Sequence, residues 1–127
     1  MRGRSLPGIA AGAGVALLAA IAVAYGAEPQ VPDPETGFVL KQRLELLDKA
    51  TDLADRFVAI RTVGYVDGIA DAAFGLGYAC YPAGIGRAEI REVVMKYLRD
   101  NPGRLGDQAS LLVLNGLFEA YPCERHE

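Results

Sequence analysis

The spacing of apolar residues is the feature that most limits how this chain can fold. In three stretches between residues 38 and 120, apolar residues recur in steps of three and four, which places them on one face of a helix. The clearest series is Ile90, Val93, Val94, Tyr97 and Leu98. No segment shows the convincing alternation of apolar and polar residues that a half-buried strand requires. The sequence therefore predicts an all-α fold.

Residues that start and stop helices divide this pattern. The periodic stretch over 38–76 is too long for one globular helix, and we expect it to break into two near Thr51–Asp55. A further helix is expected over 87–100, ended by the Asn-Pro-Gly segment that follows. Asp107 is suited to cap the last helix. The prediction is a small domain of four helices, or of five if the first is split.

The expected second helix contains two pairs of residues spaced four apart. Gly64 and Gly68 share one face, which predicts close packing of a neighbouring helix on a groove of small residues. Asp67 and Asp71 form a second, acidic stripe. Two carboxylates on one face can serve acid–base chemistry, but such a pair is more often a solvated or partner-facing patch. We interpret the two aspartates as candidate partner contacts.

The N-terminal residues have the pattern of a secretory signal. Two arginines precede an uncharged apolar stretch over residues 8–24, and its length of about 17 residues is below the ~20 that span a bilayer. Small residues then allow cleavage before Tyr25 or before Ala27. We predict a signal peptide over 1–26 and no stable membrane insertion after cleavage. An uncleaved transmembrane anchor is the alternative.

The exported part divides into a leader, a domain and a short tail. Residues 27–37 contain three prolines and no apolar periodicity, which indicates an extended leader. Thr36, near its end, can cap the first helix. We expect the helical domain over 38–123 and a tail over 124–127. Cleavage after residue 26 leaves 11 basic and 16 acidic side chains, so the formal net charge of the exported part is −5.

Composition argues against several classes of function. The formal net charge of the whole chain is −3, which does not suit a nucleic-acid-binding surface. The single histidine is His126, two residues from the end, and two cysteines are too few for a cysteine-only zinc site. We therefore expect no metal and no other cofactor. Nucleophilic catalysis would need a base that the ordered sequence lacks, so we predict that the protein is not an enzyme.

Export also determines how the two cysteines are interpreted. Two cysteines in an oxidising compartment most simply form one disulfide, here between Cys80 and Cys123. The bridge would close a loop of about 44 residues, which the chain-entropy model values at roughly 4 kcal/mol as an upper figure. A catalytic thiol is the rival interpretation, and it has no base partner.

Three segments in order carry a resemblance to a known family. They are GYVDGIADA at 64–72, CYP at 80–82 leading into EIREVVMKYLRDNP at 89–102, and ASLLVLNGLFEAYPC at 109–123. Together they resemble the Tai/Rap family of immunity proteins over about residues 36–123. Members of that family often carry two further cysteines, where this chain has Asp48 and Thr62. Their joint absence is consistent with the loss of a second disulfide.

The resemblance implies a function. Tai/Rap proteins are small exported proteins that protect Gram-negative bacteria from peptidoglycan amidases injected by type VI secretion. The resemblance implies a periplasmic, all-helical homodimer whose protruding loop can enter the amidase cleft. It also implies that the protein itself catalyses no reaction. As contacts we expect Asp67, Asp71, Tyr78 and Tyr81, with packing around the disulfide as the alternative role of the two tyrosines. The alternative is a non-catalytic structural or assembly protein of the cell envelope on the same scaffold.

Overall fold

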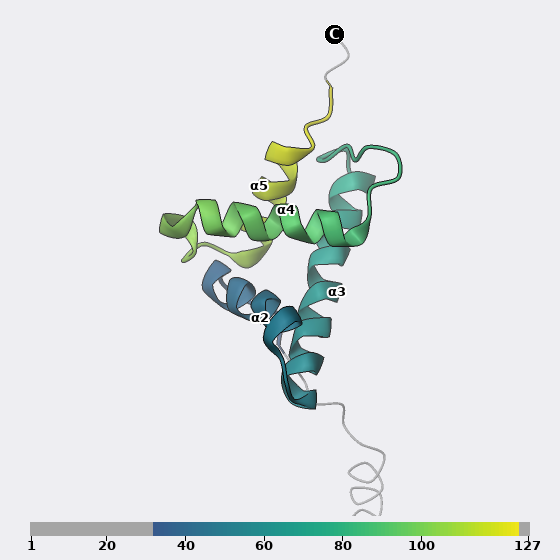
Figure 1. The fold of residues 1–127 in the computed structure, drawn as a ribbon. Helices are drawn as coiled ribbons and strands as arrows, with labels where there is room; N and C mark the ends of the chain where they lie inside the picture. The colour runs from purple at the N-terminus through teal and green to yellow at the C-terminus, as the bar shows by residue number, and fades with distance from the viewer. Residues whose placement is uncertain (1–31, 125–127) are drawn as a thin grey trace, which may run out of the picture. The chain divides into compact units, whose positions relative to one another are not determined.

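Four α-helices make up the domain, as the computed structural model of residues 32–124 shows (Figure 1). They are α2 (Gly37–Lys49), α3 (Leu53–Gly75), α4 (Arg87–Asp100) and α5 (Ala109–Ala120), with the short 3-10 turn η1 (Pro102–Arg104) between the last two. Within this range the extended pairing is a single antiparallel bridge between Thr36 and Gln108. The all-α prediction with four helices is confirmed. The predicted signal peptide, the first part of the leader and His126 lie outside the described residues.

The break between α2 and α3 lies where the sequence predicts it. Ala50 ends α2 with an extended backbone, and the carboxylate of Asp52 accepts a hydrogen bond of 2.8 Å from the Asp55 amide at the start of α3. At the other end of α2, the Thr36 hydroxyl accepts a hydrogen bond of 3.5 Å from the Val39 amide. Both helices therefore begin at residues that satisfy free backbone amides.

The start of α5 differs from the prediction. Asp107 does not cap this helix: its carboxylate accepts a 3.0 Å hydrogen bond from the Arg104 guanidinium, and the cap position is Gln108, without a side-chain bond. The Ala109 amide instead donates to the backbone carbonyl of Glu35, at 3.1 Å. The extended segment before α2 therefore supplies the acceptor, because tertiary packing brings it to the N-terminus of α5.

One hydrophobic core joins the four helices. Its helical members are Leu40, Leu44, Val66, Ala70, Ala73, Ile90, Val94, Tyr97, Leu98, Ala109, Leu112, Val113 and Leu117. In Figure 1, α4 crosses α3 steeply near the C-terminal half of α3, while α2 packs against both. At the contact of α4 with α5, a Cβ on Gly116 would lie 2.9 Å from the Tyr97 Cβ, so only glycine fits there.

The two glycines of α3 do not receive a helix of this domain. A Cβ added to Gly64 or Gly68 meets no atom within 4 Å in the described part of the chain, and both residues are exposed. The buried face of α3 includes Val66, Ala70 and Ala73 instead. The prediction of close intramolecular packing on these glycines is therefore wrong, because the other helices pack on the opposite face.

The two kinds of glycine predict opposite responses to alanine. Gly68→Ala should raise the free energy of unfolding by about 0.5–1 kcal/mol, since alanine is the better helix former and the site is open. Gly116→Ala should lower it by about 1–3 kcal/mol through overpacking against Tyr97. Urea denaturation of both variants measures these changes. The measurement is made on dilute protein, so that it reports on a single copy, and a destabilised Gly68→Ala variant would then contradict the open site.

Candidate functional site

The loop over residues 76–86, between α3 and α4, differs from the rest of the domain in having no charged side chain. Gly77 (φ 73°) and Gly84 (φ 82°) adopt the left-handed backbone that favours glycine. The Ile85 amide donates to the Pro82 carbonyl at 3.3 Å, which closes a turn with Gly84 at its third position. The loop therefore has a defined path with two glycine-dependent corners.

The first half of the loop is attached to α3 and to the end of α5. The amides of Tyr78 and Ala79 both donate to the Ala73 carbonyl, at 2.8 and 3.2 Å. The Cys80 amide donates to the Tyr121 carbonyl at 2.9 Å. The predicted Cys80–Cys123 disulfide is confirmed, with the two Cα atoms 4.9 Å apart. The loop is thus joined both by backbone hydrogen bonds and by a covalent bond.

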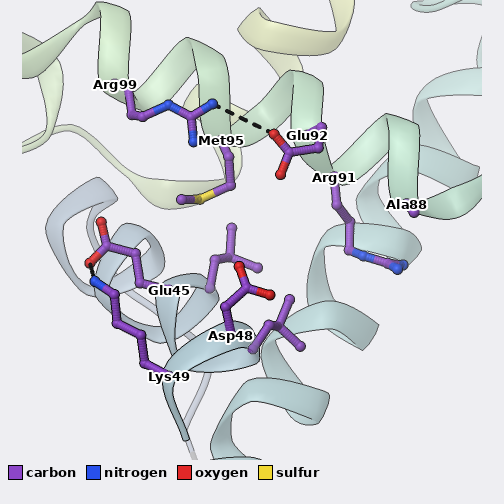
Figure 2. A pocket seen from close by; sticks show the side chains of 10 residues that line it. Glu45, Asp48, Lys49, Ala88, Arg91, Glu92, Met95 and Arg99 are labelled. Carbon is purple, nitrogen blue, oxygen red and sulfur yellow. Dashed lines mark hydrogen bonds and ion pairs between the residues drawn. The ribbon is translucent and has the colours of Figure 1, made fainter.

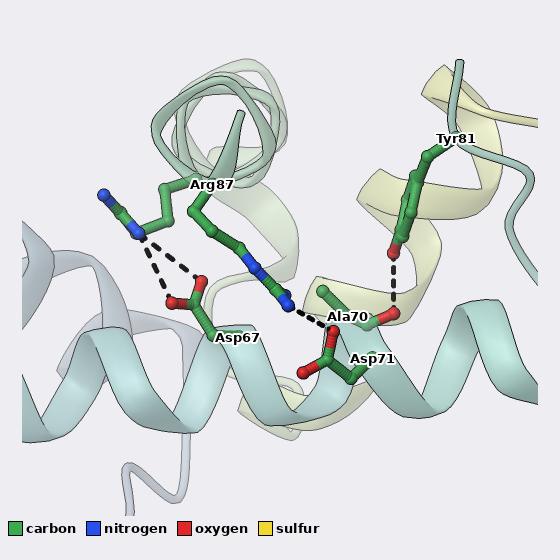
Figure 3. A network of polar contacts seen from close by, with 6 residues as sticks. Asp67, Ala70, Asp71, Tyr81 and Arg87 are labelled. Atoms are coloured by element: carbon green, nitrogen blue, oxygen red, sulfur yellow. Dashed lines mark hydrogen bonds and ion pairs between the residues drawn. The ribbon is translucent and has the colours of Figure 1, made fainter. Parts of the chain in front are cut away.

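Tyr81 holds the middle of the loop. Its hydroxyl donates a 2.8 Å hydrogen bond to the Ala70 carbonyl of α3 (Figure 3). Its ring stacks on Phe74, with 5.7 Å between centroids, and meets the Tyr121 ring edge-on at 5.3 Å. Burial, with a smaller effect from the nearby Asp71 carboxylate, raises the pKa of Tyr81. A tyrosine hydroxyl is protonated at neutral pH in any case, so it can donate this bond.

The two candidate aspartates pair with arginines of α4. Figure 3 shows Asp71 facing Arg87, with 2.7 Å between the carboxylate and the guanidinium, while Asp67 lies 3.4 Å from the guanidinium of Arg91. The pairing with Asp71 raises the pKa of Arg87. Such partly exposed pairs contribute little to stability. They do link the helices on either side of the loop, so the two aspartates are not an unpaired acidic stripe.

The spacing of charged residues in the sequence already indicated the pairing of the two aspartates with the two arginines, although it was not predicted. Asp67 and Asp71 are four apart on α3, and Arg87 and Arg91 are four apart on α4. Two such pairs of opposite charge on consecutive helices can meet where the helices cross, as they do here. The aromatic partners Phe74 and Tyr121 had no comparable signal, because their approach to Tyr81 depends on the path of the loop.

The two candidate tyrosines have different surroundings. Tyr78 is 60 % exposed, and the neighbouring Leu76 is 75 % exposed. Tyr81 is partly buried against the core. Together with Phe74, which is also exposed, Leu76 and Tyr78 form what we term the apolar tip of the domain. Large exposed apolar side chains that cluster in this way are typical of surfaces that bind a partner.

Apart from the loop, a hollow lies between α2 and α4, and Figure 2 shows the residues that line it. Leu44, Leu47, Ala88 and Met95 are its apolar residues. Charges of both signs surround them, among them Glu92, whose carboxylate lies 3.6 Å from the Arg99 guanidinium. Because the two signs are balanced, the electrostatics of this hollow favour no particular ligand.

Two features bear on metal binding and on membranes. Among residues 32–124, no three histidine, cysteine, aspartate or glutamate side chains gather closely enough to hold a metal ion. No helix in the same range is long and apolar enough to cross a bilayer.

Comparison with known proteins supplies a family. The family model described as Rap1a immunity proteins matches residues 36–123, which is more than half of the chain and includes all four helices and both cysteines. No curated protein matches the chain significantly. The match agrees with the resemblance to the Tai/Rap family found in the sequence.

The loop anchors predict a difference between its two tyrosines. Tyr81→Phe should lower the free energy of unfolding by about 0.5–1.5 kcal/mol, because it removes the hydroxyl bonded to Ala70. Tyr78→Phe is the matched control and should change it by less than about 0.5 kcal/mol, since Tyr78 is exposed. Denaturant titration of both variants checks this. Equal effects would contradict the anchoring role of Tyr81.

Proposed function

Because the chain belongs to the family of Rap1a immunity proteins, we propose that it binds and inhibits a peptidoglycan amidase delivered by type VI secretion. The protein acts by covering the active-site cleft of the amidase and catalyses no reaction itself. This action takes place in the periplasm of a Gram-negative cell, where the amidase reaches the cell wall. The signal-like sequence over residues 1–26 supports export to that compartment.

The single observation that carries the binding mode is the anchored loop with its apolar tip. In Figure 1 the loop extends beyond the C-terminal end of α3 before it returns to α4. Its base is held by the disulfide and by Tyr81, while Leu76 and Tyr78 remain exposed. A loop that is ordered before binding loses less conformational entropy when it docks, so such an arrangement favours tight association.

The four candidate contact residues take two roles in this proposal. Tyr78 contacts the amidase directly, because it is exposed and a tyrosine buries a large area at low entropic cost. Tyr81, Asp67 and Asp71 keep the loop and its flanking helices in place through Ala70 and the two arginines of α4. The net charge of −5 on the exported part would speed association with a basic amidase.

We also propose that two copies of the chain associate, as the resemblance to the family implies. The outer face of α3 suits this contact, since Ile60 is 66 % exposed and the backbone at Gly64 and Gly68 is open to close approach. A two-fold axis across this face would bring the same open backbone together from both copies.

The binding proposal is tested by affinity capture and by inhibition. The chain, used as bait under oxidising conditions with a periplasmic extract, should capture a secreted amidase and abolish its hydrolysis of purified peptidoglycan. Tyr78→Ala should weaken inhibition about tenfold or more, as expected when an interface anchor is lost. Phe38→Ala, also exposed but on α2, is the control and should inhibit normally. Capture of envelope components without an amidase would favour the structural or assembly role.

The association of two copies is tested by the molar mass of the protein in solution. Gly68→Leu should leave the circular dichroism spectrum unchanged, because the site is open within one copy. It should shift the molar mass measured by light scattering from that of a dimer to that of a monomer, since a bulky side chain prevents close approach of two α3 helices. A wild-type protein that is already monomeric at high concentration would refute this association.

A further inference from the structure

The disulfide that joins the loop 76–86 to the end of α5 lies outside the hydrophobic core. Cys80 is exposed and Cys123 is partly exposed, whereas the core consists mainly of side chains from the four helices. A thiol reductant can therefore reach the bond without opening the core. We propose that this disulfide is a redox-controlled clamp, which orders the loop when it is formed and releases the loop when it is reduced, while the helices stay folded. The effect on binding rests on the proposed function.

The bond controls the loop through the segment that follows α5. This helix ends at Ala120, and residues 121–124 continue without regular structure. The Tyr121 carbonyl and ring both contact the loop, at the Cys80 amide and at the Tyr81 ring. Within the described residues, one further backbone hydrogen bond holds this segment: the Tyr121 amide donates to the Leu117 carbonyl. The disulfide is the covalent attachment of this segment to the loop.

Reduction removes that attachment and leaves residues 121–124 held by the bonds of Tyr121 and by the packing of its partly buried ring against the core. A segment that buries so few apolar groups opens at a low free energy. When Tyr121 moves away, the Cys80 amide loses its acceptor and the Tyr81 ring loses its edge-on neighbour. The core side chains of α5, such as Val113 and Leu117, keep their contacts. The change is therefore confined to the loop and the C-terminal segment.

The chemistry is a two-electron thiol–disulfide exchange. In the forward direction a dithiol reductant transfers two electrons and two protons to the Cys80–Cys123 bond, which becomes two thiols, while the reductant becomes a disulfide. In the reverse direction a disulfide-bearing oxidant accepts the two electrons and two protons and the clamp closes. The chain contains no other cysteine, so no competing pairing within one copy exists.

The clamp makes binding of the amidase depend on the cellular compartment in which the chain is found. Thiols stay reduced in the cytosol and form disulfides in the periplasm. A chain that has not been exported therefore carries an open loop, and the loop reaches its docking shape after the bond forms outside the cytosol. The inhibitor is then selective for amidase molecules that have reached the cell wall compartment.

Amide hydrogen exchange of the purified full chain tests the clamp without any partner. After reduction with dithiothreitol, exchange at Cys80 and Ile85 should accelerate about tenfold or more, whereas exchange at Val113 and Leu117 in α5 should change little. Reoxidation should restore the slow rates. The variant Cys80→Ser/Cys123→Ser is the matched control: it should show the fast loop with and without dithiothreitol, because it has no disulfide to reduce.

Two outcomes would overturn the clamp. Unchanged loop exchange after complete reduction, verified by thiol counting, would show that Tyr81 and the backbone bonds hold the loop alone. Loss of protection throughout α5 would show that the disulfide sustains the whole domain. Both outcomes are measured on the wild-type protein. The result therefore does not depend on whether the double variant folds.

A binding measurement then connects the clamp to inhibition. The oxidised chain and the reduced chain are compared as inhibitors of the amidase recovered by affinity capture, and reduction should weaken inhibition about tenfold or more. Equal inhibition by both forms would refute the functional consequence of the clamp. If the oxidised chain captures no amidase, the proposed function fails, while the exchange experiment still decides on the clamp itself.

Discussion

The packing of α5 onto α4 and α3 is the constraint on which the rest of the structure depends. Gly116 lets the backbone of α5 approach the Tyr97 side chain closely, and Leu112, Val113 and Leu117 are buried around this contact. Because α5 is fixed in this way, its C-terminal end lies beside the loop that follows α3. A loop of eleven uncharged residues thereby gains both a hydrogen-bond acceptor and a covalent attachment.

The helices could be predicted from the sequence, because their apolar periodicity matches the faces that they bury in the core. Periodicity located α4, and the break before Asp52 was expected because the periodic stretch over 38–76 is too long for one globular helix. Two details did not follow. The side chain of Asp107 was suited to a cap, but an acceptor from the distant Glu35 serves α5. Small residues at Gly64 and Gly68 indicated close approach but not what approaches, since the pattern is the same for a neighbour in another chain.

The candidate site was predictable in its chemistry and less so in its geometry. The two cysteines and the family pattern indicated the disulfide and the importance of the loop. Sequence alone could not assign different roles to Tyr78 and Tyr81, because the path of the loop decides which ring turns toward the helices. Nor could it show that Asp67 and Asp71 are neutralised by arginines, since that depends on how α3 and α4 cross.

The contact between the segment before α2 and the start of α5 has a consequence for biogenesis. The first described residues of the chain complete the last helix, through the Glu35 carbonyl and the bridge between Thr36 and Gln108. Pairing between the two ends of a domain cannot form while one end is still being synthesised or threaded through a translocon. A domain closed in this way completes its fold only after Glu35 and Ala109 are both free to pair, so its last helix gains its full set of backbone bonds late in folding.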